Sequence, residues 1–136
     1  MTVGYSGTPL PRKLGIKPGM SMAVLNAPSN LNTILGPLPD GVTTSRRLAD
    51  HRDLVLIFIT RQADLAAQVP VLTSAIAPDG MIWVAWPKRA SKIETDMTED
   101  VIREIVLPAG VLVDVKVCAI DEIWSGLKLV IRKERR

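Results

Sequence analysis

Apolar runs bounded by turn residues predict the strands of one buried sheet. Residues 20–26 are apolar at nearly every position and residues 53–60 at every position between their ends, as in strands buried on both faces. Residues 77–88 open with a Pro-Asp-Gly turn, continue into an apolar run and stop at Pro87. A weaker β-branched stretch at 42–45 adds a further strand.

Two amphipathic segments predict helices that cover this sheet. Residues 60–76 repeat apolar side chains every three or four positions, and Pro70 should bend or divide the resulting helix. Asp96 followed by Glu99 matches a capping box, which opens the second covering helix. A brief helix is also expected at 29–35, before a Gly-Pro stop.

The last two apolar runs predict an antiparallel hairpin. Residues 111–120 and 127–132 are joined by residues 121–126, a connection too short for a crossover helix. Strands that alternate with helices through right-handed crossovers predict an α/β fold. We therefore expect a three-layer sandwich whose mostly parallel sheet ends in an antiparallel hairpin.

Composition indicates one compact domain. A chain of 136 residues with 47% apolar and 23% charged residues buries a sizeable core without disulfides or metals. We expect a single domain over residues 1–136, with a Gly- and Pro-rich arm at 1–18 and a basic tail at 132–136. Cys118 is the only cysteine, so the chain has no intrachain disulfide and no zinc site of the paired-cysteine kind.

The net charge of +3 is equal to that of the tail. Residues 132–136 hold four basic side chains and one glutamate, which leaves residues 1–131 neutral overall. No stripe of aromatic and basic residues accompanies the tail, so a nucleic-acid partner is not expected. Prolines and asparagines interrupt the longest uncharged stretch, and no secretion signal opens the chain. We expect no membrane contact and a cytoplasmic location.

The carboxyl ends of the parallel strands define a candidate site without any motif, because ligands of open α/β sheets bind at that edge. The residues expected there offer aromatic surfaces, positive charge and free backbone amides, which suit a small anionic or aromatic ligand. An equal alternative for Trp86 is that it fills the edge of the sheet as a packing residue. The set comprises Asn26, Ser29, Thr60, Arg61, Trp86, Lys88, Asp121 and Trp124.

No residue set in the chain predicts catalysis. His51 is the lone histidine and precedes the strand at 53–60, so it is expected at the opposite edge of the sheet. There it cannot act as a base for Cys118 or a serine. Walker-type and GxGxxG phosphate loops are absent. We therefore expect no catalytic residue, no metal and no cofactor.

Five segments resemble the signature segments of a family of small bacterial proteins classed only as a domain of unknown function. The resemblance spans nearly the whole chain, and it brings no activity with it. The segments read GYSGTPL at 4–10, LGIKPG at 14–19, WVAWPK at 83–88, TDMTE at 95–99 and CAIDEIWSGL at 118–127.

More distantly, the layout resembles the Rossmann-like S-adenosylmethionine-dependent methyltransferases, which open with a Pro-Gly turn, a first strand and a glycine-rich loop, and finish with a hairpin. Aligned from the Pro-Gly turn, the acid of the family's first strand falls on Val24, and its first two loop glycines fall on Asn26 and Pro28. The acid that holds the ribose after the second strand is replaced by Ser-Arg-Arg at 45–47. The resemblance favours a cofactor-free relative of this fold.

Three functions remain open from the sequence. Our main prediction is a non-enzymatic small-ligand-binding or regulatory module, motivated by Trp86, Lys88 and Trp124. The second is a methyltransferase-like enzyme with an altered cofactor loop, motivated by topology. The third is a structural or protein-interaction subunit, which forms a homo-oligomer or binds a protein partner through the hairpin or the arm.

Overall fold

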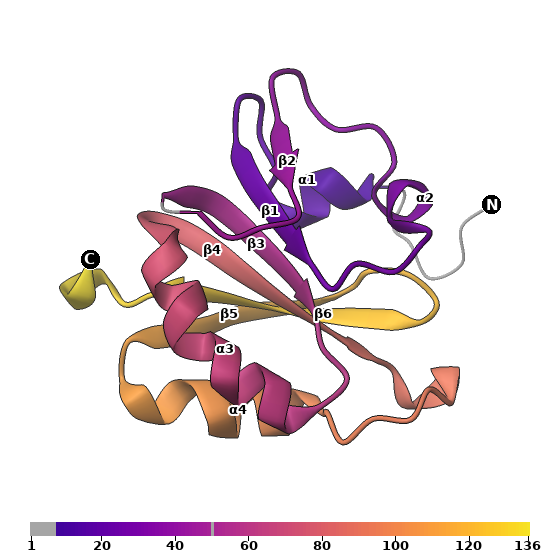
Figure 1. Cartoon of the computed structure of the whole chain (residues 1–136). Helices are drawn as coiled ribbons and strands as arrows, with labels where there is room; N and C mark the ends of the chain where they lie inside the picture. The colour runs from indigo at the N-terminus through magenta and orange to yellow at the C-terminus, as the bar shows by residue number, and fades with distance from the viewer. Residues whose placement is uncertain (1–7, 50) are drawn as a thin grey trace.

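The computed structural model describes residues 8–49 and 51–136, which form a six-stranded mixed sheet with helices on both faces (Figure 1). The strand order is β2-β1-β3-β4-β6-β5. The first four strands are parallel, whereas β6 runs antiparallel to both of its neighbours. This confirms the predicted α/β fold with a terminal hairpin. The strands are β1 (Ser21–Leu25), β2 (Thr43–Ser45), β3 (Arg52–Phe58), β4 (Ile76–Pro87), β5 (Leu112–Ala119) and β6 (Trp124–Ile131).

Four α-helices form the two outer layers of the described chain. Apolar residues of α1 and α2 pack in one core with one face of the sheet, and those of α3 and α4 pack in a second core on the other face. Figure 1 shows α3 and α4 side by side below the sheet. The helices are α1 (Leu10–Leu14), α2 (Leu31–Leu35), α3 (Gln62–Ala75) and α4 (Glu99–Val106), with 3₁₀ turns η1 (Arg89–Ser91), η2 (Leu107–Ala109) and η3 (Lys133–Arg135).

Neighbouring side chains of the central strands belong to different cores. Residues 54–58 of β3 and Ile59, which follows the strand, are all buried. Their unbroken apolar sequence is typical of a strand buried on both faces. In β4, Trp83 lies in the α1–α2 core and Trp86 in the α3–α4 core. The Trp83 indole Nε1 donates a hydrogen bond to the Leu14 carbonyl at 2.9 Å, which ties the residue that ends α1 to the middle of the sheet.

The helix boundaries differ from the predictions in two places. Pro70 lies inside α3 and does not divide it, whereas a bend at this residue stays a prediction. α4 is capped by Thr98, whose hydroxyl accepts from the Val101 amide at 3.1 Å, and not by Asp96.

The structure describes part of the predicted arm and all of the predicted basic tail. Residues 1–7 of the predicted arm lie outside the described residues, and the rest of the arm contains α1. The basic tail ends in η3, and its Arg136 Nε donates to the Ile131 carbonyl at 2.8 Å.

A methyl group at Gly126 should destabilise the fold, because this residue of β6 lies against the buried Trp83. A Cβ atom there would stand 3.0 Å from Ile120 Cδ1 and 3.1 Å from Trp83 Cε3. We expect Gly126→Ala to lower the free energy of unfolding by about 1–3 kcal/mol, measured by chemical denaturation. Ser125→Ala, at the neighbouring and partly exposed position, should change it by less than about 0.5 kcal/mol. Equal stability of both variants would contradict this packing.

Candidate functional site

A cavity of about 330 Å³ opens at the carboxyl ends of β1, β2 and β3. This is the point where the chain switches from one side of β1 to the other, the usual ligand position in open α/β sheets. Its volume falls at the lower end of the range for small-molecule sites, roughly 300–1,000 Å³. The lining residues are Leu25, Asn26, Arg46, Arg47, Leu48, Ile57 and Gln68.

Asn26 forms the turn that opens the cavity. It directly follows β1 and has a φ of 56°, in the left-handed region that few residues other than glycine adopt and that asparagine tolerates best. The chain therefore turns sharply away from the sheet at this residue. Its side chain is exposed, and it stands where the resembled methyltransferases have a loop glycine.

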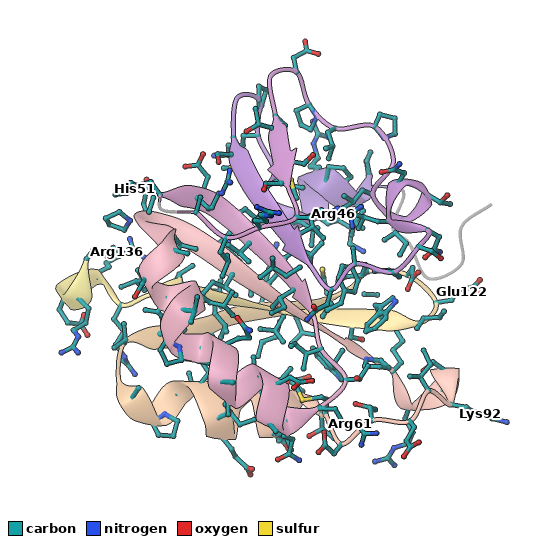
Figure 2. All side chains as sticks on the ribbon, in the orientation of Figure 1. Arg46, His51, Arg61, Lys92, Glu122 and Arg136 are labelled. Carbon is teal, nitrogen blue, oxygen red and sulfur yellow. The ribbon has the colours of Figure 1, made fainter. Side chains whose placement is uncertain are left out.

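Arg46 and Arg47 supply the charge of the cavity. The Ser45 hydroxyl accepts from the Arg47 amide at 3.1 Å and lies 3.2 Å from the Arg47 carbonyl, to which it donates. This local turn holds the backbone of the arginine pair at the end of β2. Both side chains are exposed, and no carboxylate of the described residues lies within 4.0 Å of either guanidinium. Figure 2 labels Arg46 beside the base of β2.

The remaining lining residues divide by chemistry. Leu25, Leu48 and Ile57 provide an apolar wall, and the Gln68 amide of α3 adds a neutral polar group. None of the described lining residues carries a carboxylate. The cavity therefore suits a ligand with an apolar or aromatic part, hydroxyl groups and an anionic end.

Of the predicted site residues, only Asn26 lines the cavity. Thr60 and Arg61 lie at the end of β3 beside the loop that precedes α4: the Thr95 hydroxyl donates to the Thr60 carbonyl at 2.6 Å, and the exposed Arg61 guanidinium is 3.8 Å from the Glu94 carboxylate. Ser29 is exposed in the turn before α2.

Lys88 and Asp121 do come together, but in a structural contact. The Lys88 ammonium donates to the Asp121 carbonyl at 2.7 Å. The Asp121 carboxylate in turn accepts from the amides of Ile123 and Trp124 at 2.9 and 2.8 Å. These bonds close the β5–β6 turn against the end of β4, which occupies both side chains.

Trp86 and Trp124 do not share one wall of a site. Trp86 is 8% exposed within the α3–α4 core, and Trp124 is 9% exposed within the α1–α2 core. Trp124 packs edge-on against Phe58, with ring centroids 4.9 Å apart and planes at 84°. The two indoles are therefore packing groups on opposite faces of the sheet.

The histidine and the cysteine stay far from the cavity. His51 lies just before β3, at the amino end of the sheet, and Figure 2 shows it on the opposite side of the view from Lys92 and Glu122. Cys118 lies on β5, where burial raises the pKa of its thiol above the ordinary value. Neither residue is positioned to act on a ligand of the cavity.

Sequence reasoning missed most of the cavity lining. The sequence places the arginine pair at 46–47 where the resembled family has an acid. It does not predict that these arginines lie beside Asn26. The available signal was their place directly after the second strand. Leu25, Ile57 and Gln68 carry no local signal, since apolar strand residues and a polar helix residue occur throughout the chain.

Comparisons with known proteins show which fold this is. An S-adenosylmethionine-dependent methyltransferase from Aquifex aeolicus has a TM-score of 0.62 at 14% identity, over 89% of this chain and 87% of that one. The DhpI complex with S-adenosylhomocysteine has a TM-score of 0.63 at 14% identity, over 92% and 83%. TrmN from Thermus thermophilus has a TM-score of 0.58 at 10% identity, over 90% of this chain but only 47% of that one.

These likenesses confirm the methyltransferase-like fold and correct the main functional prediction. The prediction of a non-enzymatic binding or regulatory module is contradicted, because methyltransferases are among the similar solved structures and favour the methyltransferase-like alternative. No family model and no curated protein matches the sequence, so the resemblance to the bacterial family of unknown function stays a prediction. No helix of the described residues has the length and apolar character needed to cross a membrane.

Asp96 should stabilise α3 rather than α4. Its Oδ1 accepts from the Gln62 amide, the first of α3, at 2.8 Å, and its carbonyl accepts from the Gln62 side chain at the same distance. We expect Asp96→Ala to lower the free energy of unfolding by about 1 kcal/mol, as for the loss of a helix cap. Asp96→Asn keeps an acceptor oxygen and should lose less than half of that in chemical denaturation. Wild-type stability of the alanine variant would contradict this role.

Proposed function

We propose that this chain is a methyltransferase-like enzyme with an altered cofactor site, and that the cavity at the ends of β1, β2 and β3 is that site. The observation that carries the proposal is the position of the cavity, at the switch point of a sheet with this fold. We also place the enzyme in the cytoplasm, because a single cysteine suits a reducing compartment.

The lining residues fit S-adenosylmethionine through contacts that differ from those of the resembled family. Leu25, Leu48 and Ile57 would pack against the adenine ring. The amide oxygens of Asn26 and Gln68 would accept from the ribose hydroxyls, and the arginine pair at 46–47 would hold the carboxylate of the amino-acid part. When bound, the cofactor supplies an electrophilic methyl group on its sulfonium.

The charge of the cavity favours the demethylated product over the cofactor. Both compounds carry a carboxylate that a guanidinium can pair with, but only S-adenosylmethionine adds a positive sulfonium. A like charge about 8 Å from a guanidinium, at an effective dielectric constant of about 40, costs about 1 kcal/mol. The proposal replaces the expectation of no cofactor with a weak, positively charged cofactor site.

Binding calorimetry with S-adenosylhomocysteine and S-adenosylmethionine tests this function. At 50 mM salt we expect the product to bind about fivefold more tightly than the cofactor, which corresponds to the 1 kcal/mol of charge repulsion. The preference should shrink at high salt, because the arginines are exposed and screened. No heat with either compound would contradict the proposal.

A charge-matched pair of variants locates the binding. Arg46→Gln with Arg47→Gln should weaken product binding at least tenfold and abolish the preference over the cofactor, since both compounds then meet a neutral rim. The control variant, Arg61→Gln with Arg89→Gln, removes two exposed arginines that lie outside the cavity, and it should leave the affinity within twofold. Equal losses in the two proteins would place the ligand elsewhere.

A further inference from the structure

Lysines that are far apart in the sequence gather over β5 and β6. Lys116 of β5 stands directly opposite Lys128 of β6 in the strand register, where opposed side chains lie about 5 Å apart at Cβ. The Lys13 ammonium of α1 donates to the Ala119 carbonyl of β5 at 3.1 Å. Lys17, which follows α1, is close enough to Lys128 to lower the pKa of its ammonium. We call these four residues the lysine face.

The lysine face lies on the same side of the sheet as α1. Lys128 is opposite Trp83 in the β4–β6 register, and Trp83 packs in the core that contains α1. Opposed residues of neighbouring strands point to the same side of a sheet. The lysines therefore spread across the part of the sheet beyond α1, with the fully buried Trp83 beside them.

Three members of this cluster, Lys17, Lys116 and Lys128, have no carboxylate beside them among the described residues. No carboxylate of the described residues lies within 4.0 Å of the ammonium of Lys17, Lys116 or Lys128. On the other side of the sheet, by contrast, Arg103 of α4 contacts three carboxylates, those of Glu99, Asp100 and Asp114. Among the described residues, Arg103 is therefore paired with carboxylates, whereas Lys17, Lys116 and Lys128 lie near one another without one.

The pKa of Lys128 shows that the repulsion acts on the folded protein. Burial lowers this pKa first, and the positive charges of Lys116 and Lys17 lower it further. A folded-state pKa below the unfolded one means that, at neutral pH, the charged form is less favourable in the folded protein than in the unfolded chain. A like-charged cluster that opposes folding is typical of a binding surface rather than of a stabilising one.

We propose that the lysine face binds the phosphate backbone of a nucleic acid. Lysine is depleted at protein–protein interfaces, whereas nucleic-acid interfaces are strongly positive. Lysine contacts a phosphate as a point charge, and the tryptophans on this side of the sheet, Trp83 and Trp124, are too buried to stack on a base. Binding is therefore independent of base sequence. The proposal goes beyond the proposed function and does not depend on the cavity.

Fluorescence anisotropy with a labelled 20-base-pair duplex, made once as DNA and once as RNA, tests the lysine face. At 50 mM salt, the variant with Lys116→Gln and Lys128→Gln should bind at least tenfold more weakly than the wild type. The slope of log affinity against log salt should fall by about 2, near 0.9 for each lost phosphate contact. The control variant with Arg89→Gln and Lys92→Gln loses the same charge from η1 and its end, and it should stay within twofold.

A melting curve separates loss of the surface from loss of the fold. The double lysine variant should have a higher Tm than the wild type at pH 7, because it removes the partly buried and repelled charge at Lys128. A protein that is more stable and yet binds less would support the proposal. The proposal would be overturned if neither duplex bound, or if the control variant lost as much affinity as the lysine variant. It would also be overturned if polyglutamate of matched charge competed as well as unlabelled duplex, because the partner would then be an acidic protein.

Discussion

The alternation of side chains along β4 is the constraint on which the rest of the structure depends. β4 lies in the middle of the sheet, so successive residues must point into two different cores. Trp83 enters one core and bonds to the carbonyl of Leu14, while Trp86 enters the other. Each face therefore has its own helical layer, and α1 is held where the chain enters β1. The cavity forms at the far end of β1, beyond these packed layers.

The same division into two faces separates two kinds of positive surface. The arginine pair at 46–47 lies at the end of the sheet, beside apolar and amide side chains that give the cavity a defined shape. The lysine face lies over β5 and β6, where the ammonium groups are spread across two strands and the end of α1. Paired guanidinium groups suit a small carboxylate, whereas scattered ammonium groups suit an extended polyanion. We therefore propose a small ligand for the cavity beside the arginine pair and a nucleic acid for the lysine face.

Much of the fold could be predicted from the sequence, because its signals are local. The unbroken apolar run of β3, the periodic apolar face of α3 and the short link before β6 each indicate their structure within a few residues. Asp96 failed as a cap of α4 because its actual partner, Gln62, is 34 residues away. Tertiary contacts of this kind leave no periodic pattern in the sequence.

The candidate site was predicted less well, and the reason is geometric. Listing the residues that leave each strand leads to the edge of the sheet where the cavity opens, but it ignores the face to which each side chain points. Trp86 and Trp83 are three positions apart, so the two-residue period of a strand already places them on opposite faces. Trp124 pairs with Pro87 and follows the face of Trp83. The position of Arg46 over the turn at Asn26, by contrast, depends on a long loop and could not be derived from either segment alone.

The central claim is that the cavity at the ends of β1, β2 and β3 holds the ligand of a methyltransferase-like enzyme. Amide chemical-shift mapping by NMR, with S-adenosylhomocysteine titrated into the labelled protein, tests it most directly. The account predicts that the largest shifts occur at Asn26, Arg46, Arg47 and Gln68, with little change around Trp86 and Lys88. Shifts concentrated beside Trp86 and Lys88, or no saturable shift anywhere, would contradict it.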